Sequence, residues 1–129
     1  MSYGSSVTLP RPFEEVVAAV RTALATQGFG ILTEIDVQAT MKAKIDADMG
    51  PYLILGACNP PLAHRALQAE PSLGLLLPCN VIVRQTEDGT IVEAVDPLMM
   101  VGVSSNPALR PIADEAAVKL IAALAALAD

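Results

Sequence analysis

Apolar side chains recur at helical spacing in two long segments of the chain. In the first segment they lie three or four positions apart, at Phe13, Val16, Val17, Val20 and Leu24. This spacing predicts an amphipathic helix. Gly28 is placed to end it, because glycine readily takes the left-handed conformation that closes many helices. The second segment begins at Pro107 or Pro111 and continues to Leu127 with the same period, which predicts a C-terminal helix.

Shorter apolar runs between these helices predict strands. They cover residues 5–9, 29–35, 52–58, 75–86 and 91–95. Pro78 interrupts the fourth run and should mark a strand start, a bulge or an edge. Residues 87–89 predict a hairpin turn, since Asp-Gly readily takes the positive φ angles that such turns require. In the second run, Phe29, Ile31 and Ile35 are expected on one face.

Two further segments favour short helices. Asp36 is a candidate N-cap for residues 37–45, and residues 49–51 should end that helix. Asn59 is a candidate N-cap for residues 61–69, with Pro60 or Pro61 in the first turn. Residues 97–100 and 102–106 are expected to form a loop or a half-turn.

The order of these elements predicts one α+β domain over residues 1–129. A hairpin is present and the strands do not alternate strictly with crossover helices, which favours a two-layer sandwich of a mainly antiparallel sheet with helices on one face. Residues 52–58 and 75–83 are apolar on both faces. The uncovered face is therefore expected to meet a second subunit in a homodimer.

Composition supports a buried interface. The chain has 129 residues, which fits one domain, and 53% of them are hydrophobic against 17% charged. Averages are roughly 45–50% and 25%. Two Phe, two Tyr and no Trp leave Val, Leu, Ile, Ala and Met to build the core, and leave few side chains for base stacking.

The charge excludes some classes of partner. A formal net charge of −6 disfavours binding to nucleic acid and to anionic membrane surfaces. The N-terminal residues do not resemble a signal peptide, and the apolar run 120–128 is far shorter than the roughly 20 residues that span a bilayer. We expect a soluble cytoplasmic protein whose two cysteines are free thiols.

The candidate chemistry centres on two Cys-Asn pairs, Cys58-Asn59 and Cys79-Asn80. A predicted helix start after Cys58 would lower the pKa of its thiol. One hypothesis is thus a redox or sulfur-handling protein with Cys58 as nucleophile and Cys79 as resolving thiol. Another is a metal sensor in which His64, the single histidine, joins both cysteines. The alternative is that Cys58 is a small apolar residue that ends a buried strand.

A ligand site is the remaining hypothesis, with Gly56, Cys58, Asn59, Cys79 and Asn80 as candidate binding residues. The segment from Gly56 to Pro60 brings a strand end to a helix start, where a carboxylate or phosphate could bind. Tight packing with an Asn cap explains the same residues. Asn80, inside an apolar run, is expected to bond to the turn after Cys58. The pattern names no cofactor.

Two motifs resemble the family called domain of unknown function 302. They are GPYLILGACNPPLAHRAL at residues 50–67 and GLLLPCNVIVRQTEDGTIVEAVDP at residues 74–97, and residues 16–44 are similar as well. The resemblance implies a TATA-box-binding-protein-like arrangement and dimers, without an agreed activity. Related members carry Gly-Asn-Pro at the first motif, which indicates that the Asn-Pro turn is shared more widely than the thiol.

The sequence therefore predicts a dimeric domain that binds a small ligand or a protein partner near the Cys58-Asn59 turn. Thiol chemistry and metal sensing remain the alternatives.

Overall fold

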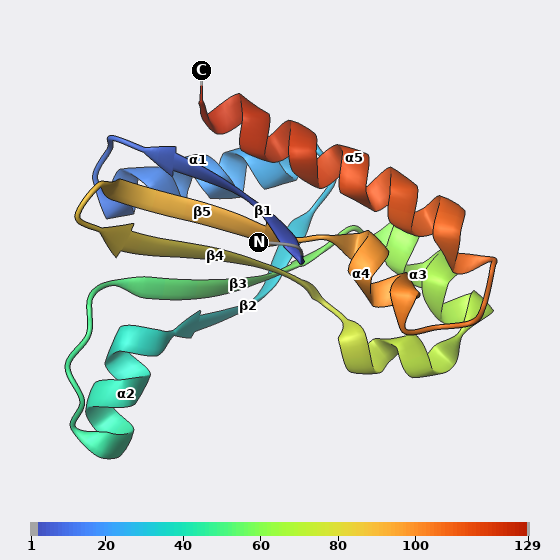
Figure 1. Ribbon diagram of the computed structural model, residues 1–129, viewed down its shortest axis with the longest axis horizontal. Helices are drawn as coiled ribbons and strands as arrows, with labels where there is room; N and C mark the ends of the chain where they lie inside the picture. The colour runs from blue at the N-terminus through green and yellow to red at the C-terminus, as the bar shows by residue number, and fades with distance from the viewer. Residues whose placement is uncertain (1–2, 129) are drawn as a thin grey trace.

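Five antiparallel strands form one sheet in the computed structural model, which describes residues 3–128 (Figure 1). In chain order they are β1 (Gly4–Leu9), β2 (Gly30–Asp36), β3 (Tyr52–Cys58), β4 (Cys79–Thr86) and β5 (Gly89–Val95). Their order across the sheet is β1-β5-β4-β3-β2. The predicted α+β class and antiparallel sheet are confirmed, and so is the hairpin between β4 and β5.

The helices fall into three groups. The long helices α1 (Phe13–Thr26) and α5 (Leu109–Leu127) contact each other and the sheet. The short elements α3 (Pro60–Ala69), the 3₁₀ helix η1 (Pro71–Leu76) and α4 (Pro97–Gly102) gather with the start of α5 beyond one end of the strands (Figure 1). Helix α2 (Val37–Ile45) stands apart, at the β2 edge.

The main core lies between one face of the sheet and the helices α1 and α5. It contains Val16, Val20, Leu55, Val81, Val83, Val92, Leu120 and Leu124. The strand residues alternate with partly exposed ones, as expected when side chains point to opposite faces in turn. Burying such an aliphatic side chain stabilises the fold by about 1.5–3 kcal/mol. The helical stripe predicted near Phe13 is thus the stripe that packs.

The opposite face of the sheet is not covered in this way. Tyr52, Ile54, Ile82 and Ile91 are half-buried there, and Arg84 pairs with Glu93 at 2.8 Å between neighbouring strands. Every residue of α2 is at least partly exposed, and Ile45 exposes 69% of its surface. We refer to Tyr52, Ile54, Ile82 and Ile91 as the open face.

Three predicted elements differ in the structure. Strand β4 begins at Cys79 and not at residue 75, because Pro71 and Gly74 turn the preceding leucines into η1. Residues 97–102 form the helix α4, whose first turn is capped by an Asp96 oxygen that accepts from the Leu98 N–H at 2.9 Å. The last helix begins at Leu109. Pro111 is tolerated in its first turn, where the amide hydrogens lack intrahelical partners.

A bulge in β2 overturns the predicted face of Ile35. The register passes from Ile31 paired with Ala57 to Thr33 paired with Gly56, and it skips Leu32. The extra residue changes the phase of the strand. Ile35, which pairs with Ile54, therefore shares the open face, and Ile31 packs against the core.

Candidate functional site

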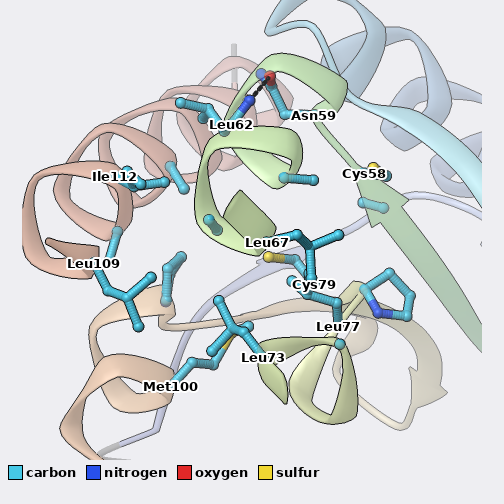
Figure 2. A pocket seen from close by; sticks show the side chains of 18 of the residues that line it. Cys58, Asn59, Leu62, Leu67, Leu73, Leu77, Cys79, Met100, Leu109 and Ile112 are labelled. Atoms are coloured by element: carbon cyan, nitrogen blue, oxygen red, sulfur yellow. Dashed lines mark hydrogen bonds between the residues drawn. The ribbon is translucent and has the colours of Figure 1, made fainter. Parts of the chain in front are cut away.

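A cavity of about 310 Å³ lies beyond the end of the strands, among α3, η1, α4 and α5 (Figure 2). Its large lining side chains are Phe29, Leu32, Leu62, Leu67, Leu73, Leu77, Met100, Val101, Leu109 and Ile112. The Cys58-Asn59 turn and Cys79 line the side nearest the sheet. The cavity therefore adjoins the motifs that the sequence indicated.

Small residues on two facing helices leave this volume open. Ala63 and Ala66 of α3 and Ala113 and Ala116 of α5 all line the cavity. Each pair is three residues apart, which places its members on one face of a helix. Because a methyl group reaches little beyond the backbone, these alanines leave room beside the larger lining side chains, such as Leu73 and Leu109.

Asn59 stabilises the turn between the end of β3 and the start of α3. Its Oδ1 accepts from the Leu62 N–H at 3.4 Å, which caps α3 as predicted. Its Nδ2 donates to the Gln27 carbonyl at 3.3 Å. Gln27 precedes Gly28, whose φ of 83° is the predicted left-handed conformation. With 9% of its surface exposed, Asn59 joins two turns that are 32 residues apart.

The same cap argues against the alternative hypothesis of an anion site at the start of α3. Pro60 and Pro61 have no amide hydrogen to offer. The Leu62 N–H donates to Asn59 Oδ1, and the Ala63 N–H donates to the Asn59 carbonyl at 2.9 Å. The first turn of α3 is satisfied internally, so tight packing with an Asn cap explains this segment.

The two cysteines are free, as predicted, but they do not form a pair of neighbouring thiols. Cys79 is opposite Ala57 in the register, and Cys58 is the next residue of β3. Successive strand residues point to opposite faces, so the thiols project to different sides of the sheet. The predicted cysteine pair is therefore wrong.

Cys79 is also in an environment that keeps its proton. Burial raises the pKa of the Cys79 thiol from its ordinary value of 9.0 to about 11, and the charge of an ionised Cys58 adds to the rise. At neutral pH Cys79 is an uncharged thiol. Nothing in this geometry favours a role as a resolving thiol.

The other candidates do not gather at the cavity. His64 is exposed on α3, and among residues 3–128 no group of three or more His, Cys, Asp and Glu side chains is placed to hold a metal ion. Asn80 is exposed and opposite Gly56, on the open-face side, so water can satisfy its amide and the expected bond to the Cys58 turn is not made. Gly56 has a packing role, because an added Cβ would lie 2.7 Å from Pro78 Cγ and would also collide with Thr33.

Most of the cavity lining was not singled out from the sequence. Leu73, Leu109 and Ile112 belong to elements whose packing the sequence does not fix. The one available signal was the alanine spacing in α3 and α5, which also fits close helix packing. The sequence does not give the distance between α3 and α5, and that distance decides whether these alanines pack closely or line a cavity.

Comparison with known proteins agrees with the fold. The sequence profile described as "Domain of unknown function DUF302" matches residues 5–127. A crystal structure of the uncharacterized conserved protein DUF302 from Bacillus stearothermophilus is similar, with 30% sequence identity and a TM-score of 0.89. The similarity covers 97% of this chain and 98% of that chain. No curated protein matches.

Replacing Asn59 should destabilise the fold. Asn59→Ala removes the cap of α3 and leaves the Gln27 carbonyl without its donor. We expect the free energy of unfolding to fall by about 1–3 kcal/mol, measured by urea denaturation. Asn80→Ala is the matched control, because Asn80 is exposed on the next strand, and should change stability by less than about 0.5 kcal/mol. Equal losses in both variants would contradict the role of Asn59.

The raised pKa of Cys79 predicts a loss of stability at alkaline pH. Between pH 9 and pH 11 the unfolded chain releases the thiol proton and the folded chain keeps it, so the free energy of unfolding decreases as pH rises. The decrease should approach about 3 kcal/mol relative to Cys79→Ala, which lacks the buried thiol. Below pH 9 the contribution is fully present. Urea denaturation at each pH tests this, and parallel pH profiles for the two proteins would refute it.

Proposed function

The chain belongs to the family described as domain of unknown function DUF302, and we propose that it is a homodimeric protein that binds a small ligand in the cavity beside the Cys58-Asn59 turn. The observation that carries the proposal is the cavity itself. Ligand pockets are concave, mostly apolar and roughly 300–1,000 Å³ in volume. At about 310 Å³ this cavity falls within that range.

The energetics of an apolar cavity favour the binding of an apolar ligand over its filling by water. Water in such a space lacks hydrogen-bond partners, and an engineered apolar cavity of about 150 Å³ in another protein stays dry and binds benzene. Here the volume is larger, and most of the lining consists of aliphatic side chains. A ligand that fills the space gains contacts that neither water nor the surrounding side chains supply.

The open face supports the dimer. Ile35 lies at its β2 edge and is exposed, and so are Met41 and Ile45 on the adjacent helix α2. Large exposed apolar patches on a monomer mark interaction sites. A second copy is the occupant we propose, because a two-fold axis would place the same open face on both partners and so bury both of them in one contact. The family resemblance implies the same assembly.

Location is part of the proposal as well. Within residues 3–128 the structure contains no helix that is long and apolar enough to cross a membrane. The two free thiols fit the reducing conditions of the cytoplasm, where we place the protein.

Filling the cavity should abolish ligand binding. The neutral fluorescent dye N-phenyl-1-naphthylamine is expected to bind saturably, one molecule per chain, in a fluorescence titration. The double variant Ala66→Leu with Ala113→Leu places two larger side chains in the cavity and should weaken binding at least tenfold. Ala125→Leu, on the exposed side of α5, is the matched control and should bind as the wild type does.

The control for folding is the urea denaturation curve of each variant. If the double variant is folded and binds the dye as tightly as the wild type, the cavity is not the site at which the ligand binds.

A charge on the open face should separate the two copies. Ile82→Lys places a cation at the centre of the proposed interface, and we expect a dimer to become a monomer in sedimentation velocity experiments. Ile121→Lys introduces the same charge on the exposed side of α5 and should leave the dimer intact. A wild-type chain that sediments as a monomer at micromolar concentration would contradict the proposed assembly.

A further inference from the structure

The walls of the cavity carry no charge. Within residues 3–128 every side chain that lines it is uncharged. Several charged groups on the surrounding elements have partners outside the cavity. Arg65 of α3 pairs with Glu115 of α5 at 3.1 Å, with both side chains about half exposed, and Glu70 accepts from Ser104 Oγ at 2.9 Å. A ligand anion would find no counter-ion on the walls.

The polar groups on the walls are already used. Both ends of the Asn59 amide are bonded within the chain, and the first turn of α3 has its amide hydrogens either paired or replaced by proline. A buried ligand oxygen would therefore lose its water without gaining a partner. That loss is unfavourable even for a neutral oxygen and much more so for an ionised one.

The raised pKa of the Cys79 thiol shows that a negative charge is unfavourable at the cavity wall. Cys79 lines the cavity and is 8% exposed. Burial is the main cause of its raised pKa, so a negative charge at this wall is disfavoured. A carboxylate at the same depth would meet the same surroundings.

The mouth of the cavity is apolar too. Among the lining residues Leu32 and Leu67 are exposed by 68% and 37%, which locates the opening between the β2 bulge and α3. Leu75 of η1, in the segment beside the opening, is exposed by 89%. With a net charge of −6, the chain as a whole also repels anions.

We propose that the cavity takes a neutral aliphatic molecule, such as an alcohol or an ester with a hydrocarbon chain, and discriminates against the carboxylate of the same chain length. The chain of the ligand occupies the space between α3 and α5, and its polar group stays at the mouth in contact with water. This inference rests on the proposed ligand-binding function and names the chemical class of the ligand.

Competition against N-phenyl-1-naphthylamine tests the discrimination. The competitors are 1-decanol, methyl decanoate and decanoate at pH 8, where decanoate is ionised. We expect the alcohol and the ester to displace the dye at concentrations at least tenfold lower than decanoate. Decanoate that competes as well as the ester would overturn the neutral class and leave the proposed function in place. If the dye does not bind the wild type and none of the three compounds raises its melting temperature, the proposed function fails.

A charge variant tests whether the preference for neutral ligands over decanoate arises at this site or from the different aqueous solubilities of the compounds. Leu67→Lys places a cation at the mouth and should improve competition by decanoate at least threefold, without improving that by 1-decanol. Val118→Lys is the matched control, because Val118 of α5 is exposed and does not line the cavity. An equal gain for decanoate in both variants would indicate a general effect of the added charge, and would contradict the location of the cavity opening beside Leu67.

Discussion

The amide of Asn59 is the interaction on which the geometry of the cavity depends. It lies where β3 ends and α3 begins, and it is bonded in both directions, to the start of α3 and to the turn after α1. A buried amide with one end unpaired would cost free energy, so the two turns are held in one relative position. The direction in which α3 leaves the sheet follows from that position. Since α3 forms one wall of the cavity, a short polar contact fixes the shape of an apolar space.

The cavity exists because the helical layer is longer than the sheet. Helix α5 has 19 residues, about 28 Å at 1.5 Å per residue, and it extends past the ends of the strands (Figure 1). Over the sheet it packs through Leu120, Leu124 and Leu127 into the main core. Beyond the sheet it faces α3 and α4, where the strands contribute only residues at their ends and α5 presents the small side chains of Ala113 and Ala116. One helix thus packs into the main core along its second half and into a smaller cluster that borders the cavity along its first half, which contains Leu109 and Ile112.

The periodicity of the sequence predicted those features that are determined within a single helix, strand or turn. The stripe of α1, the strand at residues 91–95, the cap at Asn59 and the left-handed Gly28 each follow from neighbours along the chain, and the structure has them. The cysteine pair failed because it depended on register. A one-residue difference in alignment moves a side chain to the other face of a sheet, and the chain near Pro78 does not indicate where β4 begins. The cavity could not be predicted for a related reason, since its volume depends on the separation of two helices.

Gly56 shows that the open face and the cavity are not independent surfaces. Its missing side chain is on the open-face side of β3, and Thr33 and Pro78 close over the space that a Cβ would take. Pro78 and the adjacent Leu77 also line the cavity. Any residue larger than glycine at this position would displace Pro78, and the displacement would be felt at the cavity wall, because close-packed interiors transmit strain. The requirement for glycine in the Gly-Ala-Cys-Asn motif is therefore a packing constraint that connects the end of the sheet to the cavity, and the thiol has no part in it.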